Sequence, residues 1–374
     1  MEKAKISAYQ FFVLIIFFEL GTALFLPVGI TARQDIWLAF LVGMAGGFCL
    51  YLVYYGLYLY YPEIPLTEYA QKILGKALGR ILAFLYVLYF MYLAARVVRD
   101  FGELLIINFF PDTPLFVVNA LLVLVIMYTV SKGIEVLART GELLFPLLIF
   151  IFLSSLLLLG LSGVIQHANI KPVLEEGYLP VLKTAFKETL YFPFGEVLVF
   201  AMILPYLNRP KKAKQTGLFA LAVSGLILAL TKALNVSVLG VDLVQRSDFP
   251  LLSAIQTIEV AEFLERLDIF FLLTTLITVF FKVSVYFYAA VTGAANLFAI
   301  KKSSQLVYPF GAVLLFLSIT MASNYTEHIQ EGLHIVPLYM HLPFQVIIPA
   351  FFLVIAFFKN KNKTGQNKPE QGVN

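Results

Sequence analysis

The sequence contains one cysteine, Cys49, and one tryptophan in 374 residues, and only 13% of its residues are charged. A single cysteine excludes an internal disulfide, and because Cys49 lies in an apolar run we expect its thiol to be buried. Soluble globular chains carry about 25% charged residues. This chain is instead 60% hydrophobic, with a mean hydropathy of +0.86. We therefore predict an all-α polytopic membrane protein.

The signatures of common enzymes are also missing. The sequence has no phosphate-binding glycine loop, no nucleophile elbow and no zinc-ligand spacing. We therefore expect no enzyme, no metal and no cofactor. The net charge of +4 does not indicate nucleic acid, because positive charge on a membrane protein mainly records orientation. The histidines all fall in segments that we predict to be external, and we interpret them as solvated loop residues: His167, His328, His334 and His341.

Ten apolar segments can be counted, and a membrane span needs about 20 residues. The segments that begin at Leu115 and Leu306 are at the lower limit of that length. The ten are Ala8–Ile30, Trp37–Tyr60, Ile81–Ile107, Leu115–Val130, Leu143–Val164, Val181–Tyr206, Gly217–Leu239, Leu267–Val291, Leu306–Ala322 and Pro343–Phe358.

Lysine and arginine alternate between the loops on the two sides. One loop holds Arg209, Lys211, Lys212 and Lys214, whereas the segment from 109 to 114 has none. The lysine-rich side is cytoplasmic, so the pattern places both termini there, as an even number of spans requires. We predict a transmembrane domain over 1–360 and a disordered cytoplasmic tail over 361–374.

Two segments between the spans have a character of their own. The stretch "PLTEYAQKILGKALG" places Leu66, Tyr69, Ile73 and Leu74 on one helical face, which predicts a short amphipathic helix at the inner surface. The external stretch 241–268 is long enough to form structure of its own.

The first span is expected to be broken. Its stretch "FFELGTALFLPVGI" contains a carboxylate at Glu19, a Gly-Thr pair at Gly21 and Thr22, and Pro27. In a continuous lipid-facing helix a charge at mid-depth costs several kcal/mol, a glycine about 1 and a proline about 3. The interruption is therefore a feature to be explained.

The sixth span carries a second interruption, in "ETLYFPFGEVLVF", where Pro193 disfavours helix at Phe192 and Gly195 loosens the next turn. If the ten spans form two inverted sets of five, spans one and six are counterparts. Interrupted spans at matching positions point to a binding site at mid-membrane. The alternative is that each glycine or proline only makes a packing kink.

A break exposes backbone groups of both signs. Free N–H groups at Thr22–Leu24 suit a carboxylate, and free carbonyls near Glu19 and Phe192 suit an ammonium. Both together suit a small amino acid, and two phenylalanines favour a small neutral one such as alanine or valine. The candidate ligand-binding residues are Gly21, Thr22, Ala23, Leu24, Tyr191, Phe192, Phe194 and Gly195.

Span three contains four charges, Arg96, Arg99, Asp100 and Glu103, three and four residues apart on one helical face. We expect pairs between Arg96 and Asp100 and between Arg99 and Glu103. Either this strip is self-neutralised inside the bundle, or it is an outer network or docking face that responds to a ligand or a partner.

Lys282 in span eight is isolated among apolar residues, and an ammonium in hydrocarbon needs an anion. Its depth matches that of Glu19, which predicts that the two lie within reach of each other, directly or through one water. The alternative is that Glu19 stays neutral and hydrogen-bonded to span six while Lys282 pairs elsewhere. Glu196 begins the second half of span six, where it suits a capping role. Lys232 in span seven is a weaker counterpart of Lys282.

Several co-linear stretches resemble known families. "GTALFLP" is similar to the Gly-Thr-Gly-Ile-Phe motif in span one of the amino acid–polyamine–organocation transporters, although Ala23 replaces the second glycine. "FELGTALFLP", "PLTEYAQKILGK", "YLAARVVRDFGELL", "KGIEVLARTGELLFP" and "FPFGEVLVFAMILPYL" together resemble the B subunit of endospore germinant receptors.

The resemblance implies a LeuT-like fold and a location in the inner membrane of the bacterial spore. It also implies assembly with a membrane-anchored A subunit and a lipoprotein C subunit. In LeuT-like folds span eight packs against span one where sodium-coupled members bind a cation, so Lys282 resembles a fixed substitute for that cation.

Three functions remain open. The chain is a ligand-sensing receptor subunit, a transporter of amino acids coupled to protons through Glu19 or Lys282, or a conduit for ions or water gated by its ligand. Apart from the resemblance, nothing in the sequence separates the first two, because a binding pocket looks alike whether or not its ligand is released.

Overall fold

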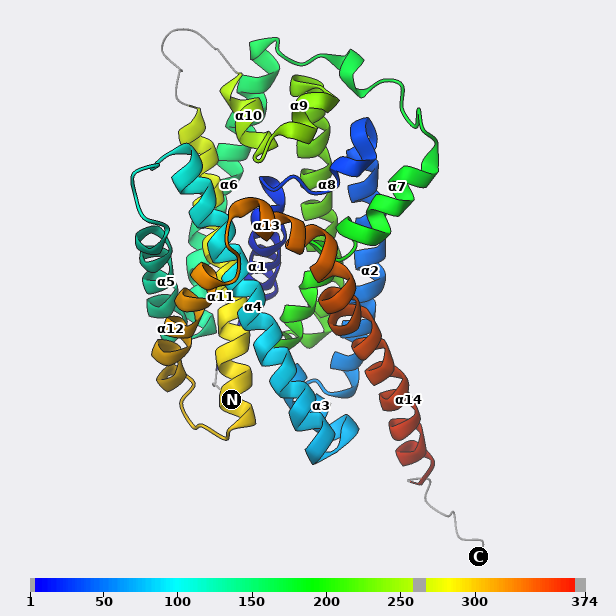
Figure 1. The fold of residues 1–374 in the computed structure, drawn as a ribbon. Coiled ribbons are helices and arrows are strands. Elements are labelled where there is room, and N and C mark those ends of the chain that lie inside the picture. The colour runs from blue at the N-terminus through cyan, green and yellow to red at the C-terminus, as the bar shows by residue number, and fades with distance from the viewer. Residues whose placement is uncertain (1–3, 258–266, 367–374) are drawn as a thin grey trace, which may run out of the picture.

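The computed structural model describes residues 4–257 and 267–366 as a bundle of helices (Figure 1). Within those ranges the only extended pairing is an isolated parallel bridge between Ile6 and Leu207. This bridge ties the segment before the first span to the end of the sixth. The all-α fold class is therefore confirmed.

The described part of the first half of the chain contains six α-helices and three 3₁₀ helices. In order they are α1 Ala8–Leu20, the 3₁₀ helices η1 Thr22–Leu24 and η2 Ile30–Asp35, α2 Ile36–Tyr60, α3 Leu66–Leu74, α4 Lys76–Asn108, α5 Leu115–Ser131, α6 Ile134–Ser162 and η3 His167–Ile170.

The second half begins with the sixth span and ends with a long tilted helix. Its elements are α7 Tyr178–Thr184, the π-helix η4 Ala185–Thr189, the 3₁₀ helices η5 Phe194–Met202, η6 Leu204–Tyr206 and η7 Pro210–Lys212, α8 Ala213–Leu239, α9 Val241–Arg246, α10 Pro250–Gln256, α11 Asp268–Leu297, α12 Ser304–Thr320, α13 Tyr325–Gln330, the π-helices η8 Glu331–Ile335 and η9 Pro337–Ile347, and α14 Ile348–Gln366.

Each of the ten predicted apolar segments coincides with helical structure, but the number of crossings stays a prediction. Six described helical stretches are individually long and apolar enough to span a membrane. A seventh would combine Ser304–Thr320 with Tyr325–Ile335, which are bent by 106°. The helices Ala8–Leu20 and Leu115–Ser131 are apolar but shorter. Each helical piece of a broken span is shorter than a full span, so a test based on helix length does not detect such spans.

The first span breaks where the sequence predicted. Ser7 caps α1 by accepting from the Gln10 backbone N–H, and Gln10 closes the capping box in return. The helix stops at Leu20 because Gly21 leaves helical geometry, with φ 19° and ψ −127°. A single 3₁₀ turn follows, and Gly29, at φ 80°, leads the chain toward α2.

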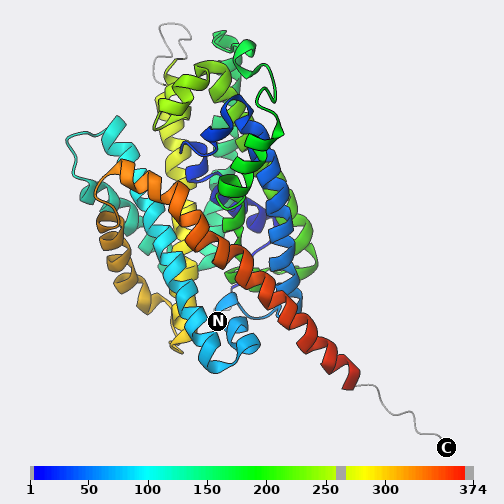
Figure 2. The same ribbon diagram turned by 45° about the vertical axis from the view of Figure 1, so that its right-hand side comes forward.

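The sixth span is broken as well. The helix α7 loosens into a π-helical turn, residues 190–193 form an irregular turn, and η5 continues as a 3₁₀ helix. The two broken spans pack together through aromatic rings, since Phe11 and Phe18 of α1 both meet Phe200 of η5 edge-on. Figures 1 and 2 show α1 enclosed by the other helices.

The predicted amphipathic helix is present as α3. Leu66, Tyr69 and Ile73 are buried on its apolar face. Its backbone packs so closely on α4 that a Cβ on Gly79 would overlap the backbone of Gln71. The apolar face therefore covers the protein itself.

The tenth span is much longer than the predicted Pro343–Phe358. Helical structure runs from Tyr325 to Gln366 with two π-helical stretches, and crosses the bundle obliquely (Figure 2). The first six residues of the predicted disordered tail thus continue α14, and the rest lie outside the described residues. The external stretch 241–268 forms α9 and α10, with 258–266 outside the described residues.

The expected burial of Cys49 is wrong. Its side chain is exposed on the outward face of α2, whereas Gly47 and Leu50 are buried. An apolar run fixes that a residue lies in a span, but not on which side of the helix it lies.

The packing of α2 on the sixth span gives a test of the fold. A Cβ on Gly47 would lie 2.6 Å from the Phe194 Cβ, whereas one on Gly160 meets nothing within 4 Å. Both Gly47→Leu and Gly160→Leu gain helix propensity, but only Gly47→Leu overpacks the contact with span six. Gly47→Leu should therefore be less stable than Gly160→Leu by about 1–3 kcal/mol. Thermal unfolding of the two purified variants in detergent checks this. Equal midpoints would contradict the close packing.

Candidate ligand site at the broken spans

A small cavity with several charged and polar side chains in its walls lies where spans one, three, six and ten meet. We call it the central cavity; its volume is about 40 Å³. Its polar walls are Thr22, Arg96, Asp100, Glu196 and His341. Pockets that hold small molecules measure about 300–1,000 Å³. The central cavity is therefore too small to hold an amino acid in this structure.

The charged group beside this cavity is the ion pair between Lys282 and Glu196. The Lys282 Nζ lies 2.5 Å from Glu196 Oε2, and both side chains are buried. The ammonium also lies over two aromatic rings, 4.8 Å from the centre of Phe18 and 4.7 Å from that of Phe192. Cation–π contacts of this kind are stronger where water is excluded. Lys282 thus joins spans one, six and eight.

Lys282 bonds Glu196, so the direct form of the predicted pair between Glu19 and Lys282 is wrong, and a contact through one water stays a prediction. Glu19 is fully buried, and neither of its carboxylate oxygens has a hydrogen-bond partner among the described residues. The rotation of each helix decides which carboxylate the ammonium reaches. Glu196, predicted to cap a half-helix, is the ion-pair partner instead.

Gly21 lies against the Lys282 side chain. A Cβ built on Gly21 would overlap the Lys282 Cδ and come within 2.9 Å of the Phe18 carbonyl oxygen. The glycine therefore both breaks span one and leaves room for the lysine that crosses the break.

A second lysine holds the carbonyls of the first span. Lys232 of α8 donates to the Leu26 carbonyl at 2.9 Å and to the Leu24 carbonyl at 3.5 Å. Its ammonium also lies 5.5 Å from the centre of the Phe40 ring. The sequence placed the free carbonyls near Glu19 and gave Lys232 a lesser role, so this contact was missed.

The remaining candidate ligand residues are divided among several environments. Thr22 and Phe192 line the central cavity, and the Thr22 hydroxyl has no partner among the described residues. Ala23, Leu24 and Tyr191 are buried without lining that cavity. Phe194 packs on Phe40 of α2, and Gly195 lies against the Gln345 side chain.

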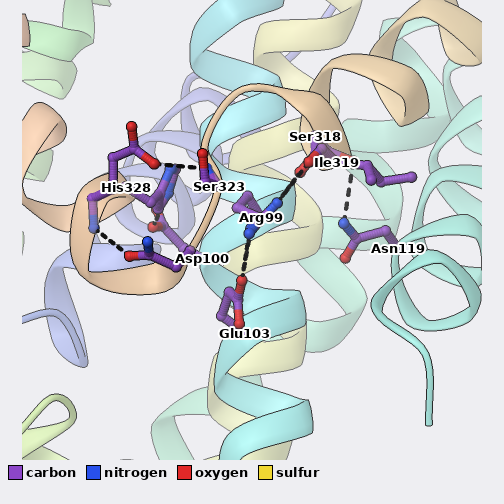
Figure 3. A network of polar contacts seen from close by, with 10 residues as sticks. Arg99, Asp100, Glu103, Asn119, Ser318, Ile319, Ser323 and His328 are labelled. Atoms are coloured by element: carbon purple, nitrogen blue, oxygen red, sulfur yellow. Dashed lines mark hydrogen bonds and ion pairs between the residues drawn. The ribbon is translucent and has the colours of Figure 1, made fainter.

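The charge strip of span three holds spans nine and ten. The expected pair between Arg96 and Asp100 is wrong. Asp100 Oδ1 lies 2.8 Å from His328 Nε2 (Figure 3). Arg96 donates to the His328 backbone carbonyl at 2.5 Å. Arg96 also approaches Glu331, with N and O 4.0 Å apart. Arg96 and Asp100 of span three therefore both bond to His328 of α13. We call Arg96, Asp100 and His328 the latch.

The second expected pair is confirmed. Arg99 donates through Nε to Glu103 Oε1 at 2.8 Å, and its Nη2 lies 2.7 Å from the same oxygen. Arg99 also donates to the Ile319 carbonyl at the end of α12, and nearby Asn119 of α5 donates to Ser318 Oγ (Figure 3). The four charged side chains of the strip are therefore buried, and each bonds to another residue.

Two of the four histidines were placed wrongly. His167 and His334 are exposed as expected, but His328 and His341 are buried. His341 Nδ1 lies 2.6 Å from the Tyr89 hydroxyl, which also accepts from Gln345. The spacing of His341 and Gln345, four residues apart, was the available signal for one helical face. Among the described residues no group of three His, Cys, Asp or Glu could hold a metal ion.

The ion pair at the break predicts a specific rescue. Lys282→Met should cost about 3–5 kcal/mol of stability by stranding the buried Glu196 charge, and adding Glu196→Gln should recover part of it. Adding Glu19→Gln instead should recover less, because Glu19 makes no hydrogen bond to Lys282. Thermal unfolding of the purified variants measures this. If Glu19→Gln restores more stability to Lys282→Met than Glu196→Gln does, then Glu196 is not the main ion-pair partner of Lys282.

A matched pair of salt bridges tests the strip. Arg99 with Glu103 and Arg33 with Glu176 have the same 2.7 Å separation, but the first pair is buried and the second about half exposed. In double-mutant cycles with glutamine, the buried pair should couple by about 1–3 kcal/mol and the exposed pair by about 0.2–1. Equal coupling energies would show that burial does not control the interaction.

Comparisons with known proteins agree with this architecture. A family model described as "Spore germination protein" matches residues 5–326. The chain is 53% identical over 363 residues to spore germination protein KB of Bacillus subtilis (strain 168), covering 97% of both chains. It is 26% identical to spore germination protein YndE of the same organism, over 84% of this chain and 87% of that one.

Two solved structures share the fold. MhsT in complex with L-phenylalanine superposes with a TM-score of 0.66 at 11% identity, covering 96% of this chain and 87% of that one. Mhp1, a nucleobase-cation-symport-1 family transporter, gives 0.64 at 10% identity, with 98% and 94% covered. These likenesses confirm a LeuT-like fold with broken spans one and six. By its sequence match and its fold, this integral membrane protein belongs to the spore permease family, which includes the B subunits of germinant receptors.

Proposed function

We propose that this chain is the ligand-sensing membrane subunit of a spore germinant receptor. It binds a small amino acid at the unwound parts of spans one and six and signals to partner subunits. The observation that carries the proposal is the central cavity, where both breaks meet charged side chains of opposite sign. The family is of permease or receptor type, which fits a binding role better than catalysis.

The walls of the central cavity complement a zwitterion. Arg96 offers a guanidinium to the ligand's carboxylate, and Asp100 and Glu196 offer carboxylates to its ammonium. The unpaired Thr22 hydroxyl is a further donor or acceptor at the break. Phe192 supplies the apolar wall, so a small neutral side chain fits.

Binding requires the cavity to enlarge, and the latch is the part that has to move. Arg96 and Asp100 now bond to His328, and a ligand that takes over either contact releases α13 from span three. A ligand shifts such an equilibrium by its difference in affinity for the two states. Release of α13 is thus a change that a partner subunit can detect.

The family also bears on partners and location. The relatives are spore germination proteins, and a receptor of this kind works as a complex. We propose a membrane-anchored A subunit and a lipoprotein C subunit as partners, in the inner membrane of the spore.

Glu19 favours a second candidate, a proton-coupled amino acid transporter. Its carboxyl group is buried beside the break and forms no hydrogen bond with the described residues. A carboxyl group in that position is suited to carrying a proton. Counterflow of radiolabelled alanine and valine in proteoliposomes separates the two functions, because a sensor binds the label without exchanging it. Exchange that Glu19→Gln abolishes would favour the transporter.

The break itself provides the test of the proposal. Gly21→Leu should abolish the germination response of spores, because its side chain collides with Lys282 and closes the break. Thr22→Ser keeps the hydroxyl and should change the response by less than about threefold, because that factor corresponds to no more than the net free energy of one hydrogen bond. Gly160→Leu is the control, since its Cβ meets nothing. A normal response from Gly21→Leu spores with normal protein levels contradicts the proposed site.

A further inference from the structure

A second cavity, larger than the central one, lies on another face of the first span. We call it the apolar cavity; its volume is about 390 Å³ and its walls come from α1, α6, α8, α10 and α11. Pockets that hold small molecules measure about 300–1,000 Å³. An apolar cavity of about 150 Å³ already binds benzene. The apolar cavity is therefore large enough for a ligand of its own.

The shape of the apolar cavity suits one extended chain. Its lining on α6 runs from Phe145 to Leu159, which is about 21 Å along the helix. The volume spread over that length leaves a mean cross-section of roughly 20 Å², whereas a helix with its side chains needs roughly 80 Å². A partner's helix does not fit, but a single alkyl chain does.

A buried amide side chain faces this space without a hydrogen-bond partner among the described residues. Asn235 of α8 is 2% exposed, and neither its amide nitrogen nor its amide oxygen is hydrogen-bonded among the described residues. Its neighbour Thr231, one turn earlier, donates to the Ile227 carbonyl instead. A buried amide left unpaired costs about 1–3 kcal/mol, so a ligand that bonds it gains affinity.

The position of Asn235 sets the orientation of a ligand. It lies four residues before the end of α8 at Leu239, while Phe219, about 24 Å away along the helix, lines the opposite end. None of the described residues that line the cavity is ionisable. The amide both donates and accepts, which suits a hydroxyl, ester or amide headgroup and disfavours a charged one.

We infer that the apolar cavity binds one neutral single-chain amphiphile, with its headgroup at Asn235 and its chain between α1 and α6. A free monoacyl lipid and one ester-linked acyl chain of a bilayer phospholipid share this chemistry, because each presents an uncharged ester at the end of a single alkyl chain, while the phosphate of the phospholipid stays outside the cavity. The helix α10 packs on α8 and lines the cavity through Leu251, Ala254 and Ile255. Figure 1 shows α10 at the same end of the bundle as α9, which follows the end of α8.

The bound chain would restrain the break in span one. Leu20 and Leu24, on either side of Gly21, both line the apolar cavity. The carbonyl of the same Leu24 accepts from Lys232. A chain packed against both leucines favours the present arrangement of the break, so the site is a restraint on the movement that the central cavity needs in order to open.

Photolabelling of the purified full-length protein in phosphatidylglycerol nanodiscs tests the site. A monoacylglycerol with a diazirine in its chain should label residues of α1, α6 and α8 that line the cavity, and unlabelled monoacylglycerol should compete. Ala254→Phe, which fills the cavity from α10, should reduce this labelling at least tenfold. Leu230→Phe, on the outward face of α8, is the matched control and should leave it unchanged.

A second variant isolates the headgroup contact. Asn235→Leu should weaken competition by monoacylglycerol about fivefold, the factor expected for one net hydrogen bond, and leave competition by an alkane of equal length unchanged. Thermal unfolding separates a ligand effect from misfolding. Monoacylglycerol should raise the melting temperature of the natural protein and of Leu230→Phe, but not of Ala254→Phe.

Mass spectrometry of co-purified lipids distinguishes the sources. If phospholipid co-purifies with the natural protein but not with Ala254→Phe, the bound chain belongs to a bilayer lipid. If monoacyl lipid shows that difference instead, the ligand is a free amphiphile. Either result supports the site. Labelling spread over the outward face of the bundle and unchanged in Ala254→Phe would overturn it. So would cross-links that place a partner subunit's helix inside the cavity.

Discussion

An ammonium buried against a broken helix is the constraint on which the centre of this bundle depends. Lys282 reaches Glu196 only because Gly21 has no side chain in its path. The rings of Phe18 and Phe192 shield the ammonium from the surrounding apolar space. Buried pairs of this kind add little net stability compared with apolar residues, but removing one partner is costly, so they fix a geometry. Here the geometry that is fixed is the alignment of spans one, six and eight.

The broken backbone itself needs partners, because lipid offers none to a free carbonyl. In span one, Lys232 of α8 supplies donors to the carbonyls beyond the break. In span six, residues 190–192 return their N–H groups to Ala185 and Glu188 through a π-helical turn. The two halves thus solve the same problem differently, one with a side chain from another helix and one within its own backbone. The N–H groups of residues 190–192 therefore need no side chain from another helix.

The sequence predicted the class of fold, the positions of both breaks and the Arg99–Glu103 pair, because these follow from spacing along one chain. It did not predict the partner of Lys282. Rise per residue gives the depth of a side chain, whereas its direction depends on how each helix is rotated. His328 was missed for another reason: its segment is polar enough to resemble a loop, and only the charges of Arg96 and Asp100 across the bundle make its burial favourable. The spacing of residues along one segment does not predict contacts between spans that are distant in the sequence.

The central cavity and the apolar cavity lie on different sides of one short segment. Thr22 faces the central cavity, which Arg96 and Asp100 of the latch also line, while Leu24 faces the apolar cavity and its carbonyl meets Lys232. Three residues of 3₁₀ helix therefore separate the two cavities. Because packed interiors change between discrete arrangements rather than deform continuously, this segment cannot shift toward one space without altering the other. An enlargement of the central cavity that moves Thr22 would also displace Leu24 or the Lys232 contact, which makes η1 the element through which both spaces act on each other.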